Sequence, residues 1–145
     1  QPKFEFVTIL PDANFGPILC GDPHSTGSWV VNLMKGEDKD AKVVPNQWYI
    51  DIRDDARLHI FGLSKPELAD QRIWAAAGPF GWNDLIRILK KHYPDANIPD
   101  ENPKWVTSPL KVDSEVGRKL LGGWTSLEQC VVDTAKSVGY LAISE

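Results

Sequence analysis

The segment of residues 47–63 constrains the fold most, because the spacing of its apolar side chains changes part-way along it. Residues 48–52, Trp-Tyr-Ile-Asp-Ile, are rich in aromatic and β-branched side chains, which favour a strand. Two acids follow. We expect Asp54 to cap a helix and Asp55 to lie in its first turn, where the helix dipole favours a carboxylate. The segment therefore predicts a strand that leads directly into a helix, a joint typical of α/β proteins.

Helix patterns with clear limits occur at two places. After the joint, Ala56, Ile60 and Leu63 recur at helical spacing, and Pro66 ends the helix. Residues 82–92 form the clearest amphipathic pattern, with Gly81 as the expected N-cap and Pro94 after the end. Along one broad face of this second helix we expect Trp82, Leu85, Ile86, Ile88, Leu89 and His92.

The N-terminal region and the middle of the chain hold two further strand patterns. We expect strands at residues 4–10, closed by Pro11, and at residues 72–78, followed by a turn at Pro79 and Phe80. Residues 12–17 are expected to form a loop. Ser25 or Thr26 then caps a helix that ends at Gly36. The apolar side of that helix carries Trp29, Val30, Leu33 and Met34.

The remaining segments are loops and two short helices. Residues 38–44 form a charged connector, and the proline-rich residues 94–112 form a loop in which 105–107 have the pattern of a short strand. We expect Asp113 to cap a helix that runs to Leu121. Thr125 and Glu128 have the spacing of a capping box before the last helix. One side of that helix carries Leu127, Val131, Thr134, Val138 and Leu141.

Composition indicates one ordinary domain. The chain has 145 residues, 42% hydrophobic and 25% charged, with a formal net charge of −4. A domain of this size buries roughly 70% of its unfolded surface, and the acidic balance argues against nucleic acid or an anionic membrane as partner. We expect a cytoplasmic protein without signal peptide or membrane span, in which Cys20 and Cys130 are reduced thiols. Because Gln1 stands in place of methionine, we also expect a fragment or a processed chain.

The motif Tyr-Ile-Asp-Ile-Arg-Asp-x-Ala-x-x-His, at residues 49–59, resembles a known family. It is similar to the segment V-D-V-R-D-V-A-x-A-H of extended short-chain dehydrogenases/reductases, within the NAD-dependent epimerase/dehydratase family. The nearest branch is that of dihydroflavonol reductase-like proteins and fungal aldehyde/ketone reductases. The family usually has an aliphatic residue where this chain has Asp55. Three further stretches, at residues 10–17, 72–78 and 112–134, resemble family segments in the same order, so the likeness covers almost the whole chain and about the last two-fifths of a family member.

The resemblance implies a fold and a set of site residues. The fold is α/β: the C-terminal portion of a Rossmann-type extended short-chain dehydrogenase/reductase, with few strands and about four helices. Residues 1–145 form one substrate-binding-type domain, whose strand 4–10 belongs to the parental Rossmann sheet. The turn at Pro11 and Asn14 runs past the nicotinamide ring of NADPH in the full-length parent, and no cofactor is expected for this chain alone. The implied substrate pocket is lined by Asn14, Phe15, Trp29, Leu33 and Gln47.

The aromatic and aliphatic members of that set also have a plainer interpretation, since such residues at helical spacing are typical of a core. The nucleotide and catalytic motifs of these reductases are missing. The sequence has no G-x-G-x-x-G turn. It has no Tyr-x-x-x-Lys pair either, because Tyr49, Tyr93 and Tyr140 are followed four residues later by Arg53, Asn97 and Ser144.

Two functional hypotheses follow. In the first, the chain is the substrate-binding portion of an NADPH-dependent aldehyde/ketone reductase and orients a hydrophobic carbonyl compound, without being a reductase alone. In the second, a stand-alone relative binds a hydrophobic small molecule or promotes a cofactor-independent cyclisation or isomerisation. Asp12, Asp55 or His59 would then act as acid or base, although a histidine one turn from a helix-start carboxylate is more often structural. A metal site is not expected, because Asp51, Asp55 and His59 lack a ligand spacing.

Packing adds an expectation about partners. Strand 4–10 would leave one edge and apolar faces uncovered, because parallel sheets are normally buried on both faces. We therefore expect the chain to form a homodimer through that strand or to bind its own N-terminal half.

Overall fold

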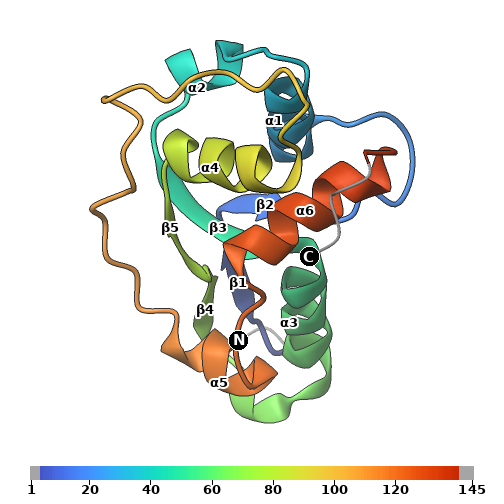
Figure 1. The fold of residues 1–145 in the computed structure, drawn as a ribbon. Coiled ribbons are helices and arrows are strands. Elements are labelled where there is room, and N and C mark those ends of the chain that lie inside the picture. The colour runs from blue at the N-terminus through green and yellow to red at the C-terminus, as the bar shows by residue number, and fades with distance from the viewer. Residues whose placement is uncertain (1–3, 141–145) are drawn as a thin grey trace.

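The computed structural model describes residues 4–140, which form two small sheets surrounded by helices (Figure 1). In the first sheet, β1 (Thr8–Pro11) pairs in parallel with β4 (Arg72–Ala75). The second sheet has the order β2-β3-β5. Its central strand β3 (Gln47–Asp51) is parallel to β2 (Ala13–Phe15) and antiparallel to β5 (Gly78–Phe80).

The helices divide between the two sheets. α1, α4 and α6 pack together beside the second sheet, whereas α3 and α5 cover the first (Figure 1). This mixed arrangement confirms the predicted α/β class. The bounds are α1 Ser25–Met34, α2 Lys39–Val43, α3 Ile52–Ser64, α4 Trp82–His92, α5 Glu115–Leu121 and α6 Leu127–Ser137, with a 3₁₀ turn at Pro66–Leu68.

Aromatic rings organise the larger of two cores, which lies between the second sheet and helices α1, α4 and α6. The ring centroids of Phe15 and Phe80 are 5.3 Å apart, and those of Trp29 and Trp82 are 5.1 Å apart. The predicted apolar face of α4 is confirmed, with Leu85, Ile86 and Leu89 fully buried. A smaller core beneath α3 contains Ile50, Leu58 and Ala75.

The strand-to-helix joint is confirmed, but its cap lies three residues earlier than predicted. β3 ends at Asp51, whose carboxylate accepts a hydrogen bond from the Arg53 N–H at 2.8 Å, so Asp51 caps α3. Asp54 is already inside the helix, and its carboxylate instead accepts from the Thr125 N–H at 2.8 Å. Asp55 lies in the first turn, as predicted.

One side of α3 stays uncovered by the described part of the chain. Ile60 is 61% exposed and Leu63 is 92% exposed, although both lie at the helical spacing noted in the sequence. Leu58 on the opposite side is fully buried. The apolar pattern of α3 therefore has two sides, of which this chain buries one.

The first predicted strand, residues 4–10, was placed too early. β1 begins at Thr8, and Phe6, which the prediction put in the strand, is 60% exposed. The Phe6 carbonyl accepts from the Asp70 N–H, so this segment is attached to the turn after the 3₁₀ helix and not to a strand. Residues 13–15, predicted as loop, form β2 because they pair with β3.

The predicted strand 72–78 is divided between the two sheets. β4 ends at Ala75, and the chain then crosses to the second sheet, where the Ala77 N–H donates to the Tyr49 carbonyl at 2.7 Å. Pro79, predicted to turn the chain, lies in β5 opposite Trp48. The apolar run is continuous, so its spacing gave no sign of this change of partner.

The caps predicted for α1 and α6 are also wrong. The N-cap of α1 is His24 and not Ser25 or Thr26; the Thr26 hydroxyl instead donates to the Asn14 carbonyl at 2.7 Å. The N-cap of α6 is Ser126, which accepts from the Gln129 N–H. Glu128 forms no capping box, because its carboxylate pairs with Lys91 and His92 on α4.

The cap predicted for α4 is confirmed. Gly81 is the N-cap of α4, and its N–H donates to the Asp84 carboxylate. At α5 the N-cap is Ser114 and not Asp113, although the Asp113 carboxylate accepts from the Glu115 N–H at 3.2 Å. Gly122, with φ of +76°, ends α5 in the left-handed conformation that glycine adopts readily.

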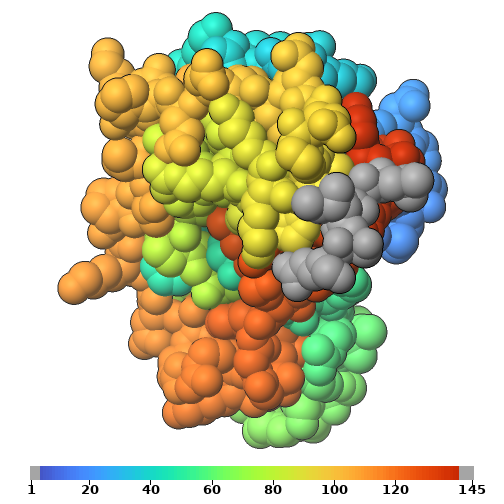
Figure 2. Space-filling view, viewed as in Figure 1, coloured from blue at the N-terminus to red at the C-terminus, as the bar shows by residue number. Residues whose placement is uncertain are grey.

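The long proline-rich loop is confirmed, although residues 105–107 form no strand. The loop runs over the surface along one side of the molecule, from α4 to α5 (Figure 2). Within the predicted connector 38–44 lies the short helix α2. Leu141, assigned to the last helix, falls outside the described residues. None of the helices in the described part combines the length and apolar character that a membrane span requires.

Candidate functional site

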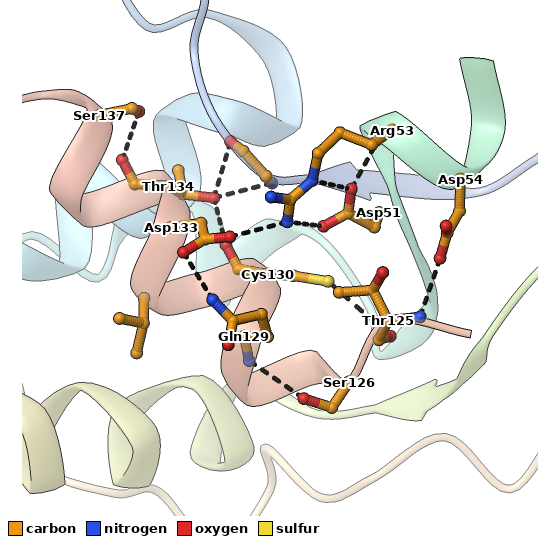
Figure 3. Close-up of polar contacts among 12 residues, drawn as sticks. Asp51, Arg53, Asp54, Thr125, Ser126, Gln129, Cys130, Asp133, Thr134 and Ser137 are labelled. Carbon is orange, nitrogen blue, oxygen red and sulfur yellow. Dashed lines mark hydrogen bonds and ion pairs between the residues drawn. The ribbon is translucent and has the colours of Figure 1, made fainter. Parts of the chain in front are cut away.

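A buried ion pair organises the carboxyl ends of β2 and β3 (Figure 3). The Asp51 carboxylate has no solvent exposure and binds the Arg53 guanidinium at 2.7 and 2.8 Å. Arg53 also binds Asp133 on α6 at 2.8 Å. Burial opposes ionisation of Asp51, but the hydrogen bonds from Arg53 outweigh it and lower the pKa of Asp51. Both groups therefore stay charged, which fits a structural role better than acid–base catalysis.

A single hydroxyl joins α6 to the turn after β2. The Thr134 Oγ1 accepts from the Gly16 N–H at 2.8 Å and lies 3.0 Å from the Gly16 carbonyl and 2.7 Å from the Cys130 carbonyl. Gly16 has φ of +128°, and an added Cβ would lie 2.8 Å from the Ile52 side chain, so no larger residue fits. These contacts fix the position of the turn that the resemblance placed beside the cofactor.

We expect Thr134→Val to lower the free energy of unfolding by about 2 kcal/mol. Valine keeps the shape of threonine but leaves the buried N–H and carbonyl of Gly16 without their hydroxyl partner. Urea unfolding followed by circular dichroism measures the change. Ser137→Ala, which removes an exposed hydroxyl on the same helix, should cost less than half as much. Equal losses of unfolding free energy in the two variants would show that the buried hydroxyl of Thr134 contributes no more to stability than the exposed hydroxyl of Ser137.

The two cysteines are free, as predicted. Burial, together with the nearby Asp51 carboxylate, raises the pKa of the Cys130 thiol, which makes it a poor nucleophile. Cys20 is exposed in the loop before α1. Among the described residues no cluster of histidine, cysteine and acidic side chains could hold a metal ion.

The predicted cofactor residues lie at the carboxyl end of β1, the edge where open α/β sheets bind ligands. Pro11 is exposed there, and Asn14 is half-buried in β2. The Asn14 Nδ2 donates to the Asp12 carbonyl, while its Oδ1 is buried without a hydrogen-bond partner. The Asp12 carboxylate accepts from the Trp48 N–H at 3.0 Å, so it supports the backbone of β3.

The predicted pocket residues are brought together only in part. Phe15, Trp29 and Leu33 all belong to the larger core, where Phe15 and Leu33 are 1% exposed and Trp29 is half-buried against Phe15. Gln47 is the first residue of β3, opposite Phe80 and away from the carboxyl end of that strand. In this chain Phe15, Trp29 and Leu33 are therefore surrounded by core residues, as the plainer interpretation of the sequence had it. The role of the five residues as a pocket wall stays a prediction.

The alternative acid–base residues Asp55 and His59 do lie close together. The His59 Nδ1 donates to the Asp55 carbonyl at 2.9 Å and lies 3.5 Å from the Asp55 Oδ1. Asp55 is 7% exposed, and its Oδ1 has no hydrogen-bond partner among the described residues. Burial raises the pKa of Asp55, and the neighbouring His59 only partly offsets this. His24, by contrast, lies in an exposed loop and contacts the Asp22 carbonyl.

A groove that the sequence did not reveal runs beside these residues. It has a volume of about 600 Å³ and lies between residues 5–9 and the C-terminal half of α3. His59, Gly62 and Leu63 form one wall, and Phe6 and Val7 belong to the other. The exposed apolar positions of α3 were the available signal, but spacing alone does not tell which side of a helix the chain itself covers.

Comparison with known proteins identifies the relatives. Ketoreductase adrE of Penicillium rubens is 37% identical over 88% of this chain, and aldehyde reductase 2 of Sporidiobolus salmonicolor is 31% identical over 94%. The homologues of this chain are fungal ketoreductases and aldehyde reductases. An NAD-dependent epimerase/dehydratase of Aspergillus terreus is 28% identical over 94% of this chain. No family model matches the chain.

Solved structures agree with these reductase relatives. The yeast methylglyoxal/isovaleraldehyde reductase Gre2, solved with NADPH, superposes on 94% of this chain with a TM-score of 0.76 and 29% identity. It is one of several extended short-chain dehydrogenases/reductases of Rossmann type that this chain resembles over their C-terminal part. The chain spans 41% of ketoreductase adrE and 43% of Gre2. The predicted likeness to the last two-fifths of a family member is confirmed.

The residues of this chain do not fit NADPH on their own. The sequence has no Gly-rich turn for a pyrophosphate, and the Asp12 carboxylate at the carboxyl end of β1 is engaged with the Trp48 N–H. Pro11 and Asn14 border only the edge where a nicotinamide could lie. A complete cofactor site would therefore need groups from another part of a reductase.

Proposed function

We propose that this chain is the substrate-binding portion of an NADPH-dependent aldehyde/ketone reductase of the dihydroflavonol reductase-like type. The observation that carries the proposal is the similarity to ketoreductases and aldehyde reductases over 88% or more of the chain. Absence of the Gly-rich turn and of a Tyr-x-x-x-Lys pair from the sequence supports the restriction to substrate binding. Hydride transfer and proton donation would come from the other portion of such an enzyme.

The chain's contribution to catalysis is orientation. Thr134 on α6 binds the turn at Gly16, and the loop before α1 continues from this turn at the carboxyl end of β2. A wall held in this way can keep a hydrophobic carbonyl compound in one pose, which lowers the entropy cost of reaction. Asn14, Phe15, Trp29, Leu33 and Gln47 are the proposed wall residues, with Asn14 supplying a buried acceptor, its Oδ1.

The partner we propose is the N-terminal portion of such a reductase. Among the described residues, β1 pairs only with β4, so one edge of a parallel sheet is open. The same side of the molecule carries the groove of residues 5–9 and the uncovered side chains Ile60 and Leu63. A further parallel strand and its helix would cover all three features together, as parallel sheets require. We name this area the β1 docking surface.

A chimera tests the proposal. Residues 1–145 replace the matching C-terminal part of Sporidiobolus aldehyde reductase 2, and NADPH oxidation is followed with a series of aldehydes and ketones. We expect carbonyl-dependent turnover by the chimera and none by the isolated chain. A chimera that folds and binds NADPH but reduces no carbonyl compound would overturn the assignment. Turnover by the isolated chain without NADPH would favour the cofactor-independent alternative, and a stable dimer of the isolated chain would show that a second copy covers β1.

A further inference from the structure

The β1 docking surface has a polar centre, which no part of the proposed function uses. His59 lines the groove with 55% of its side chain exposed, and Asp55 lies directly beneath it, 7% exposed. A nearly buried carboxylate therefore lies next to a histidine at the border of an uncovered surface.

The contacts of the Asp55 and His59 side chains show which of their polar atoms have hydrogen-bond partners. The Asp55 Oδ1 has no hydrogen-bond partner in the described residues, and the His59 Nδ1 lies 3.5 Å from it. That nitrogen already faces the Asp55 carbonyl at 2.9 Å, and a carbonyl can only accept, so Nδ1 carries the hydrogen. A proton added to His59 therefore goes to Nε2, on the ring that lines the groove.

We propose that docking on the β1 docking surface is coupled to protonation of His59, which pairs with Asp55 once both are covered. The occupant is the N-terminal portion of a reductase, so the inference rests on the proposed function. An uncovered His59 is screened by water, and its attraction to Asp55 is weak. When a strand and helix exclude water from the groove, the attraction strengthens, and an unpaired Asp55 carboxylate becomes more costly.

The other charged groups near His59 do not replace this pair. Glu5 from the N-terminal segment and Lys65 after α3 are the remaining charged side chains that line the groove, one of each sign. Lys65 is 3.5 Å from Glu67 and also lies over the Phe61 ring. Within the described lining, β4 and α5 contribute no residue at all. Asp55 is thus the anion best placed to hold a protonated His59.

The direction of the pH dependence follows from linkage. If the docked state holds the proton on His59 more tightly than the undocked state, docking takes up a proton and weakens as pH rises. Histidine normally changes charge between pH 5 and 8, so the comparison is made at pH 6 and pH 8. We expect the docked state to be favoured about tenfold more at pH 6 than at pH 8. One linked proton gives at most tenfold per pH unit, so partial uptake of the proton over the two units suffices.

The experiment uses the chimera described above, with urea unfolding at pH 6 and pH 8 as the readout. His59→Gln and Asp55→Asn should each remove most of the tenfold difference. His24→Gln, which changes an exposed histidine in the loop before α1, should leave it unchanged. In the isolated chain, where His59 stays in water, His59→Gln should alter the pH dependence less than twofold, which separates docking from the stability of the domain itself.

The two proposals fail in different ways. An active chimera whose pH dependence is the same with and without His59→Gln overturns the proton coupling and leaves the proposed function standing. A pH dependence removed by His24→Gln and not by His59→Gln also overturns it. A chimera that is inactive, and whose two portions unfold independently, overturns the proposed function and the coupling together.

Discussion

Replacing Gly81 with alanine will lower the free energy of unfolding by about 3 kcal/mol. A Cβ at this position would lie 2.2 Å from the Val106 carbonyl oxygen and 2.7 Å from the Thr107 nitrogen, both backbone atoms. The proline-rich loop would have to move away from the start of α4. That movement would break the hydrogen bonds from the Asn83 N–H to Trp105 and from the Ser108 N–H to Phe80.

Urea midpoints at pH 7 measure this effect, with Gly27→Ala as the matched control. A Cβ on Gly27 would lie 3.7 Å from Ile18, an ordinary contact, and alanine favours the helix by up to about 1 kcal/mol. Gly27→Ala should therefore leave the chain as stable or slightly more stable. If Gly81→Ala unfolds at the same urea concentration as the native chain, the loop is not held against α4 as the structure indicates.

Asp51→Asn is expected to cost about 2–3 kcal/mol at pH 7, because it removes the charge that pairs with Arg53 and weakens the cap of α3. The estimate is below that for a fully buried pair, since about half of the Arg53 side chain is exposed and stays solvated. Asp133→Asn, which removes only the second partner of Arg53, should cost less. Thermal unfolding of the two variants gives the comparison.

The pH dependence of Asp51 supplies a second test with a definite sign. Its pKa is lower in the folded state than the usual value, so its contribution to stability is present above about pH 4 and is lost as pH falls through the lower, folded pKa. The difference between native chain and Asp51→Asn should therefore shrink between pH 4 and pH 2. A difference that stays constant across this range would show that the charge of Asp51 does not contribute.

The sequence predicted correctly those elements whose helix or strand pattern and end residues all lie within one short stretch. The helix at residues 82–92 was predicted with its bounds and its N-cap, because its apolar spacing, Gly81 and Pro94 all lie within one short stretch. The joint between β3 and α3 was predicted for the same reason. Its cap was not, because the Asp54 carboxylate, which was predicted to cap the helix, accepts instead from the Thr125 N–H, far along the chain, and Asp51 caps α3.

Which strands pair with one another could not be predicted from the sequence. The run Arg72–Ala75 continues into Ala76 and Ala77 without a polar residue or a turn residue, yet the chain changes sheets there. Thr125 and Glu128 had the spacing of a capping box, but His92 and Lys91 on another helix compete for the Glu128 carboxylate. In both places a contact distant in sequence overrode the local pattern.

The candidate site was predicted less completely than the fold. Asp55 and His59 were paired on helical spacing, which the structure confirms at 3.5 Å between Oδ1 and Nδ1. Nothing in that spacing showed that Asp55 is buried without a hydrogen-bond partner or that His59 lines a groove. The groove depends on residues 5–9, which reach α3 only in the folded chain.

Gly16 bears on how this protein could be altered by design. Its positive φ, the contact an added Cβ would make with Ile52, and the hydroxyl of Thr134 leave no room for variation at the end of β2. Leu19 and Cys20, a few residues later, are exposed, whereas Gly21 has φ of +69°, a conformation in which a side chain is strained. A library intended to broaden the range of bound compounds should therefore randomise residues 19, 20 and 22 and keep Gly16, Gly21 and Thr134 constant.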